Sequence, residues 1–224
     1  MTKTALITGS NRGIGLELVK QLNTKGYEIT CLCRSKNPQL NELASQVISG
    51  INLQNYQDIQ RAKINCKAKY FDIIINNAAI FKNESIQQLD STAVSQIKDQ
   101  FITNSLAPLM VIHHFLDTLK KGSKIVLMTS RMGSIADNSS GGRYGYRMSK
   151  AALNAAGKSL ALDLKDKGVA VGIFHPGWVQ TDMTGYSGYL TASESAELLC
   201  QRIDALSMNN SGEFFHSNGD SLPW

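Results

Sequence analysis

Short apolar runs alternate with longer amphipathic segments along the whole chain, and this alternation limits the possible folds more than any other feature. The apolar runs cover residues 4–8, 27–33, 46–51, 71–76, 124–130 and 169–174, with a weaker run at 213–215. Helical patterns lie between them, near residues 13–25, 55–68, 88–120, 145–167 and 192–207. Continuously apolar strands separated by helices are typical of a parallel sheet covered on both faces. The sequence therefore predicts an α/β chain with a mainly parallel sheet of about seven strands.

The chain is long enough for one such domain. It has 224 residues, and no linker, low-complexity segment or internal repeat divides it. A chain of this size buries roughly 70–75% of its unfolded surface, so it needs no disulfide or metal for stability. We expect a single doubly wound domain over residues 1–224.

Charge and cysteine usage exclude several classes of protein. The net charge is +5, and the basic residues are scattered rather than clustered, so a nucleic-acid-binding arm is not expected. The four cysteines form no CxxC pair and have no histidine at metal-ligand spacing, so we expect no metal site. The N-terminus leads directly into a strand, and no apolar run approaches 18 residues. These features fit a cytoplasmic protein without a membrane partner.

A glycine-rich turn follows the first apolar run, in the stretch TALITGSNRGIG. Gly9 permits a tight turn, Gly13 allows backbone to approach a pyrophosphate, and Gly15 allows the following helix to pack closely. The helix that begins here would direct its free N–H groups at an anion. The spacing differs from the common G-x-G-x-x-G pattern, but its position after the first strand favours a nucleotide site over a plain structural turn.

A tyrosine and a lysine lie four residues apart in the stretch YGYRMSK, residues 144–150. On a helix, Tyr146 and Lys150 share a face, whereas Tyr144 does not share it in the same way. A neighbouring ammonium favours the phenolate, so we expect Lys150 to lower the pKa of Tyr146 and to suit it for proton transfer. Such a pair is common by chance, and the rest of the chain has to decide its meaning.

Six motifs in order resemble the short-chain dehydrogenases/reductases, from about residue 2 to at least residue 183. They are TGSNRGIG (8–15), NNAA (76–79), NSLAP (104–108), TSRMG (129–133), YRMSK (146–150) and HPGWVQTDM (175–183). The ending GEFFHSNGDSLPW further resembles the C-factor-like and sniffer-like carbonyl reductases of that family. The resemblance implies a single Rossmann-type domain with the substrate pocket in its C-terminal part.

The resemblance also implies a catalytic tetrad of Asn104, Ser130, Tyr146 and Lys150. Ser134 is an alternative to Ser130, but Ser130 ends an apolar run and is followed by x-x-Gly, as in the family. In the family, the tyrosine protonates the carbonyl oxygen, the serine donates a hydrogen bond to it, and the lysine favours the ionised phenol and holds the ribose. The asparagine orders a water. Because Asn is a poor residue for a helix interior, Asn104 predicts a helix kink.

The residues around the second apolar run favour NADP(H) over NAD(H). An NAD site usually has an Asp or Glu at the end of this strand, and here the sequence is CLCRS. Arg34 just beyond it and Arg12 in the glycine turn could grip a 2′-phosphate. Taken singly, either arginine could equally be solvated surface.

The other cofactor contacts implied by the family pattern lie after successive apolar runs. Asn52 replaces the usual Asp at the adenine, and Ala79 replaces a glycine, which requires negative φ there. Asn76 belongs to the same motif, and His175 is expected to pack rather than to react. The full set of expected cofactor residues is Gly9, Asn11, Arg12, Gly13, Ile14, Gly15, Arg34, Asn52, Leu53, Asn77, Ala78, Ala79, Tyr146, Lys150, Pro176, Gly177, Val179 and Thr181.

In the family, the segment after Thr181 forms the substrate lid. This segment is short here, so the resemblance implies an open pocket for a loosely selected carbonyl or alcohol. Tyr144, Trp178, Met183 and Tyr186 are candidates for its walls, or for core. We expect an NADP(H)-dependent carbonyl reductase. The alternatives are an NADP(H)-binding signalling protein with little turnover and a nucleotide-sugar epimerase, although relatives of the latter class have a larger C-terminal region. Small residues on the helix after Tyr146, from Ala151 to Gly157, allow another element to approach closely, and that element could be the protein's own sheet. In the family, this helix and the one after Asn104 often pair between subunits, so the resemblance implies a homodimer or homotetramer.

Overall fold

The computed structural model describes residues 2–224, and its centre is one parallel sheet of seven strands in the order β3-β2-β1-β4-β5-β6-β7. The sequence-based prediction of a doubly wound sheet is therefore confirmed. The strands are β1 (Thr4–Thr8), β2 (Glu28–Leu32), β3 (Gln46–Ile48), β4 (Phe71–Asn76), β5 (Leu119–Met128), β6 (Ala170–His175) and β7 (Phe214–His216). The chain adds β2 and β3 on one side of β1 and then β4 to β7 on the other, so the strand order switches between the parallel strands β1 and β4. In such sheets, ligands bind in the crevice at the carboxyl ends of the strands at this switch point.

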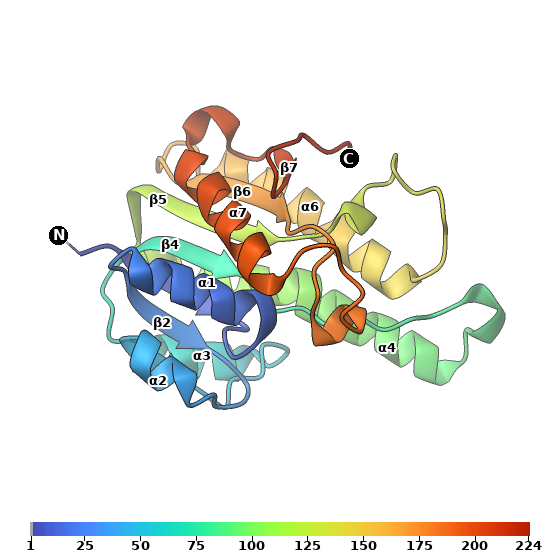
Figure 1. Ribbon diagram of the computed structural model, residues 1–224, viewed down its shortest axis with the longest axis horizontal. Helices are drawn as coiled ribbons and strands as arrows, with labels where there is room; N and C mark the ends of the chain where they lie inside the picture. The colour runs from blue at the N-terminus through green and yellow to red at the C-terminus, as the bar shows by residue number, and fades with distance from the viewer. Residues whose placement is uncertain (1) are drawn as a thin grey trace.

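Helices cover both faces of the sheet, as Figure 1 shows. On one face lie α1 (Gly13–Thr24), α2 (Gln39–Leu43) and α7 (Ala192–Ala205). On the other lie α3 (Tyr56–Asn65), α5 (Ala107–Phe115) and α6 (Tyr144–Asp163). The strands are mostly apolar because both faces of the sheet are buried: Leu6 packs with α3 and α5, while its neighbour Ile7 packs with α1 and α7.

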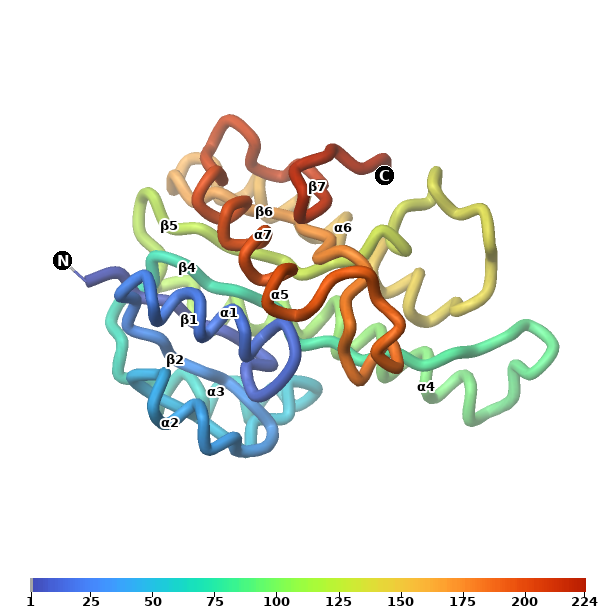
Figure 2. The backbone as a smooth tube through the Cα atoms, in the orientation of Figure 1, coloured from blue at the N-terminus to red at the C-terminus, as the bar shows by residue number. Residues whose placement is uncertain are grey.

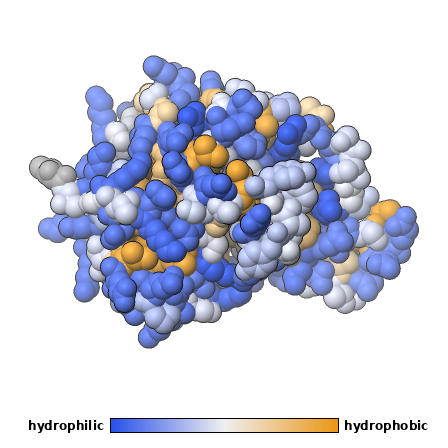
Figure 3. Space-filling view, viewed as in Figure 1, coloured by the Kyte–Doolittle hydropathy of each residue, from blue (hydrophilic) through white to orange (hydrophobic). Residues whose placement is uncertain are grey.

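The outer surface has the opposite character. Figure 3 shows the face formed by α1 and α7 as mostly hydrophilic, with apolar residues in separate spots. No helix within residues 2–224 is long and apolar enough to span a bilayer.

The predicted helix near 88–120 is wrong in its detail. It consists of α4 (Ser91–Phe101), a π-helical segment (Ile102–Leu106) and α5, and the chain already enters β5 at Leu119. Pro108 explains part of this: it lacks an N–H and cannot donate to the carbonyl oxygen of Asn104 in the usual α-helical way. The kink predicted from Asn104 is therefore present as the π-helical segment. The short helix α2 was not predicted.

Two segments leave the body of the protein at the carboxyl edge of the sheet. Figure 2 shows residues 81–90, before α4, and residues 134–143, before α6, projecting on the same side. The opposite edge has a hollow of about 590 Å³ lined by several lysines and by Asp72 and Asp204. Lys25 pairs with Asp204 at 2.6 Å there, and Lys120 pairs with Asp72 at 3.1 Å. Because both carboxylates of this hollow are already paired with lysines, it has no evident ligand chemistry.

Candidate active site

Tyr146 and Lys150 lie one turn apart on α6, facing the carboxyl end of β5. The Lys150 side chain is buried, and its Nζ donates a hydrogen bond to the carbonyl oxygen of Met128 at 2.7 Å. The same Nζ lies 5.7 Å from the centre of the Tyr146 ring. Phe81 stands edge-on to that ring, with 5.2 Å between ring centres. The helical spacing thus places phenol and ammonium side by side, as predicted.

The two candidate serines have different environments. Ser130 lies just beyond β5, where its hydroxyl oxygen accepts from the N–H of Met132 at 3.2 Å and its proximity to the Tyr146 phenol lowers the pKa of that phenol. Ser134 is four residues further along, where its hydroxyl donates to the carbonyl oxygen of Trp224 at 3.2 Å and accepts from the N–H of Asp137 at 3.1 Å. Ser134 therefore holds the loop against the end of the chain, and Ser130 is the serine that meets the phenol.

The protonation states differ from the prediction that the ammonium lowers the pKa of Tyr146. Burial raises the pKa of Tyr146 to about 12, against the smaller lowering effect of Ser130. Burial also lowers the pKa of Lys150 to about 7. The prediction is wrong because it treated the pair as solvated. In a buried site, the loss of water disfavours the charged form of each group, so each group favours its neutral form.

Asn104 is fully buried in the π-helical segment. Its Oδ1 accepts from the N–H of Ile80 at 2.8 Å, while its Nδ2 donates to the Ile80 carbonyl oxygen and to the Ser149 hydroxyl at 3.0 Å. Ser149 in turn donates to the carbonyl oxygen of Tyr146 at 2.8 Å, and the Ser105 hydroxyl donates to the carbonyl oxygen of Ser149 at 2.6 Å. The π-helical segment is thus fastened to α6 within one turn of Tyr146.

The glycine turn has the backbone that the sequence predicted. Gly9 and Gly13 have φ of 65° and 54°, a left-handed conformation that favours glycine. A Cβ on Gly15 would overlap the carbonyl oxygen of Gly9, so α1 packs directly against the turn. Asn11, Arg12 and Ile14 complete the segment.

The side chains of Asn77 and Thr8 hold the glycine turn and the end of β4 together by hydrogen bonds. Sequence analysis did not predict this structural role. The Asn77 side chain donates to the carbonyl oxygens of Thr8 and Gly9, both at 3.1 Å, and the Thr8 hydroxyl accepts from the N–H groups of Asn77 and Ala78. The only signal for this role was the position of both residues at the ends of adjacent strands. Ala79, which replaces the usual glycine of this motif, was expected to need a negative φ. It is not among the residues with positive φ, so it meets this requirement.

Arg34 and Arg12, the two arginines expected at the 2′-phosphate, differ in their surroundings. Arg34 is exposed just beyond β2. Arg12 pairs with Asp182 at 2.5 Å, and Asp182 also accepts a hydrogen bond from the Tyr186 hydroxyl at 2.6 Å. This pair joins the glycine turn to the short segment after β6.

Asn52 has a local hydrogen bond in addition to its predicted adenine contact. Its Oδ1 accepts from the N–H of Gln54 at 3.1 Å, and the second lone pair of this oxygen is left for an adenine amino group. Leu53 beside it is half-buried.

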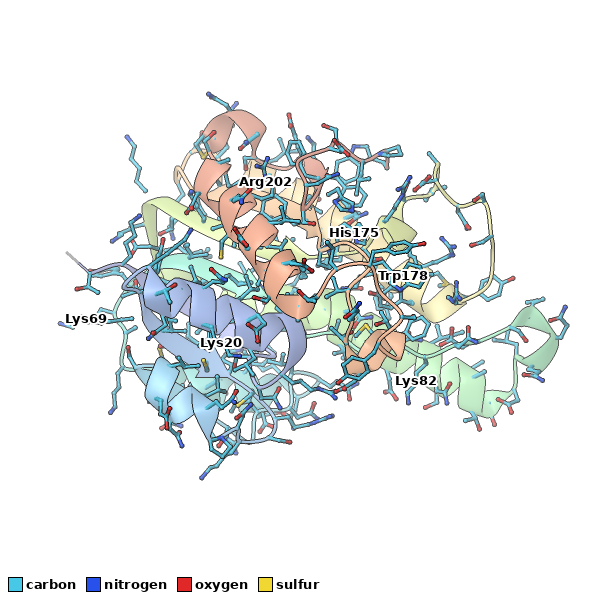
Figure 4. The ribbon with its side chains drawn as sticks, viewed as in Figure 1. Lys20, Lys69, Lys82, His175, Trp178 and Arg202 are labelled. Atoms are coloured by element: carbon cyan, nitrogen blue, oxygen red, sulfur yellow. The ribbon has the colours of Figure 1, made fainter. Side chains whose placement is uncertain are left out.

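The chain after β6 closes over the glycine turn. Gly177 has φ of 91°, Val179 is buried, and a Cβ on Gly13 would lie 3.5 Å from Cγ2 of Thr181. The Pro176 carbonyl oxygen accepts from the Ser195 hydroxyl at 2.8 Å. Figure 4 shows His175 and Trp178 in this region, where the His175 ring packs against His216 with 4.9 Å between ring centres. Burial lowers the pKa of His175 to about 3, consistent with packing.

These features fit a dinucleotide. The glycines add no side chains to the turn, and the amino terminus of α1 follows it directly. The buried Nδ2 of Asn76, at the end of the adjacent strand β4, has no partner within the described chain. No group of three or more His, Cys, Asp or Glu within residues 2–224 could hold a metal ion. The arrangement combines a phenol, a hydroxyl donor and a buried lysine at one edge of a nucleotide cradle.

Comparison with known proteins identifies the family. A model of the short chain dehydrogenases matches residues 3–189, and the chain belongs to the short-chain dehydrogenase/reductase family. It is 33% identical over 227 residues to 1-hydroxy-2-glutathionyl-2-methyl-3-butene dehydrogenase of Rhodococcus sp. (strain AD45), covering 99% of both chains. It is 41% identical over 155 residues to C-signal of Myxococcus xanthus, covering 68% of this chain and 92% of that protein.

Solved structures agree with this assignment. The carbonyl reductase Sniffer of D. melanogaster has a TM-score of 0.91 at 32% identity, covering 100% of both chains. The NADPH-bound carbonyl reductase from chicken fatty liver has a TM-score of 0.89 at 28% identity, covering 100% of this chain and 99% of that one. The chain is therefore an oxidoreductase of the carbonyl-reductase-like part of the family.

Proposed function

We propose that this protein is an NADP(H)-dependent carbonyl reductase acting on small aldehydes, ketones or the corresponding alcohols. The observation that carries the proposal is the meeting of Ser130, Tyr146 and Lys150 at the carboxyl end of β5, next to the glycine cradle. A protein that only bound a nucleotide would have no need of a buried phenol and lysine at this place.

Each side chain has a chemical role in this proposal. Tyr146 donates its proton to the substrate carbonyl oxygen, and a phenol whose pKa is raised to about 12 is fully protonated and ready to do so at neutral pH. Ser130 donates a hydrogen bond to the same oxygen, where negative charge develops. NADPH, when bound, supplies the hydride.

Lys150 would return the proton after turnover. With a pKa of about 7, it exchanges protons readily at neutral pH, and its ammonium stabilises the phenolate that Tyr146 becomes. Pro108 has no N–H to donate to the carbonyl oxygen of Asn104, so this oxygen lacks its usual α-helical partner. We assign to it the binding of the water that links Lys150 to solvent.

The remaining predicted residues would hold the cofactor. The glycine turn receives the pyrophosphate, Pro176 to Thr181 cover the nicotinamide, and Arg34 meets the 2′-phosphate. The absence of an acidic residue at the end of β2 supports NADPH over NADH, as does the NADPH in the chicken carbonyl reductase structure.

The test is NADPH oxidation with a panel of aldehydes, ketones and quinones. We expect turnover with several of them, and Tyr146→Phe should retain NADPH binding while losing turnover. Tyr144→Phe is the matched control, because Tyr144 is half-exposed at the start of α6, and it should retain most activity. If Tyr144→Phe is inactive and Tyr146→Phe is active, the assignment of the proton donor is wrong.

A signalling role is a second candidate, favoured by the similarity to C-signal. The two functions make different predictions: a signalling protein would bind NADP(H) without turnover of any carbonyl in the panel. The protein would act as a homodimer or homotetramer in either case. Gly157 does not contribute to that contact, because it packs against Ile173 and Leu127 of its own sheet, but the exposed apolar residues of α4 and α6 support it.

A further inference from the structure

Glu84 is a buried acidic residue that the proposed chemistry does not use. It is 4% exposed, and within residues 2–224 no lysine, arginine or histidine forms an ion pair with it. Glutamates are rarely buried without a cationic partner, because removing the charge from water is costly. The position therefore requires an explanation in the hydrogen bonds around it.

Two donors from different helices occupy the two carboxylate oxygens. Oε1 accepts a hydrogen bond from Nε2 of Gln100, a fully buried residue on α4. Oε2 accepts from the backbone N–H of Gly145 at 3.2 Å, in the first turn of α6. The amino terminus of a 20-residue helix also carries partial positive charge, which compensates a carboxylate placed there.

The network joins three segments that are far apart in sequence. The Oε1 of Gln100 accepts from the N–H of Lys82 at 2.8 Å, and the carbonyl oxygen of Glu84 accepts from the N–H of Arg143 at 3.1 Å. Figure 4 shows Lys82 beside α4. The two projecting segments of Figure 2 are thereby tied to each other and to α4.

The absence of a side chain at Gly145 allows the start of α6 to pack closely against α4. A Cβ on Gly145 would lie 3.0 Å from Cα of Ile97 and would overlap the Gln100 amide, so α6 begins directly against α4. Tyr146 is the next residue. It therefore lies between the Glu84 contact on one side and the clamp from Asn104 and Ser105 to Ser149 on the other.

We propose that Glu84 is a positioning residue for the reaction: it fixes the first turn of α6 and so sets where the Tyr146 phenol stands relative to Ser130. This inference rests on the proposed catalytic role of Tyr146. It does not concern substrate or cofactor binding directly, because the contacts of Glu84 lie on α4 and α6 and not on the glycine turn.

Glu84→Gln tests the proposal with little change in volume. A glutamine has one acceptor oxygen, and three donors point into the network, from Lys82, Gln100 and Gly145. Whichever way the amide introduced at position 84 and the amide of Gln100 are rotated, two buried N–H donors face each other without an acceptor between them. We expect the first turn of α6 to shift and kcat to fall roughly tenfold to a hundredfold, the scale for misplacing a reacting group. The KM for NADPH should be nearly unchanged.

A double variant provides the rescue. In Glu84→Gln/Gln100→Glu, the new carboxylate at 100 accepts from the N–H of Lys82 and from the amide at 84, whose oxygen accepts from Gly145. Every donor again has an acceptor, so kcat should recover most of the loss. Glu28→Gln is the matched control: it removes the same charge from an exposed position at the start of β2 and should leave kcat unchanged.

The outcomes separate the possible roles. If Glu84 only supported folding, Glu84→Gln would lower the unfolding midpoint while the folded enzyme kept the wild-type kcat, which would overturn the proposal. So would a double variant no better than the single one. Should the variants fail to fold, hydrogen exchange on the wild type decides: the Gly145 amide should be protected, although N–H groups in the first turn of a helix usually exchange freely. Free exchange would refute the contact. An active Tyr146→Phe would instead refute the proposed function.

Discussion

Lys150→Met should stabilise the protein, and by an amount that depends on pH. The Lys150 side chain is 2% exposed, and its only recorded hydrogen bond within residues 2–224 is the one to the Met128 carbonyl oxygen at 2.7 Å. Burial lowers its pKa to about 7 from an ordinary value of 10.5. Below about pH 7, the protein therefore holds an ammonium where it is poorly solvated, and methionine has a similar length without the charge.

The sign follows from proton linkage. Because the folded pKa lies below the unfolded one, the unfolded chain binds more protons between pH 7 and 10.5, and wild-type stability rises with pH in that window. The cost of the charged lysine is fully present below about pH 7. A difference of 3.5 pH units at about 1.4 kcal/mol each sets an upper scale of about 5 kcal/mol. Inside the window, the slope should approach about 1.4 kcal/mol per pH unit.

The measurement is urea unfolding of wild type and Lys150→Met between pH 6 and 10, without cofactor. We expect the variant to be the more stable protein at pH 6 and its advantage to shrink as pH rises, while the other titrating groups cancel in the difference. Lys158→Met, at an exposed position on the same helix, is the matched control and should show a difference independent of pH. A flat difference for Lys150→Met between pH 7.5 and 10 would refute the depressed pKa.

Other variants test the cofactor site, the serine and the assembly. Arg34→Ala should weaken NADPH binding roughly ten- to a hundredfold and leave NADH unchanged in fluorescence titrations, since only NADPH has the phosphate; equal weakening of both would show a structural role. Asp182→Asn frees Arg12 from its ion pair and should tighten NADPH binding by up to about fivefold at low salt, with no change for NADH. Ser130→Ala should lower kcat about a hundredfold or more, whereas Ser134→Ala should act mainly on stability; similar losses of kcat would leave the serine unassigned. Light scattering at micromolar concentration should give the mass of a dimer or tetramer, and a monomeric mass would contradict the assembly proposal.

Local sequence patterns were sufficient to predict much of the secondary structure and part of the candidate site. Continuous apolar runs predicted the strands because a sheet buried on both faces excludes polar residues, and four-residue spacing predicted that Tyr146 and Lys150 share a face of α6. The glycine turn could also be predicted, because the positive φ of Gly9 and Gly13 is a local requirement. Asn104 also indicated that the helix is irregular where the π-helical segment lies, although not which type of irregularity it is.

Tertiary structure decided what depends on distant partners. The contacts of the two candidate serines decided between Ser130 and Ser134. Ser130 lies at the Tyr146 phenol, whereas the Ser134 hydroxyl donates to the carbonyl oxygen of Trp224. The partner of Arg12 is 170 residues away, and Glu84 reads in the sequence as an ordinary loop residue until α4 and α6 enclose it. The pKa values of Tyr146 and Lys150 moved opposite to the expectation for a solvated pair. Spacing determines which groups are neighbours, but only the packed fold determines how much water they lose, and in this site that loss sets the direction of both pKa shifts.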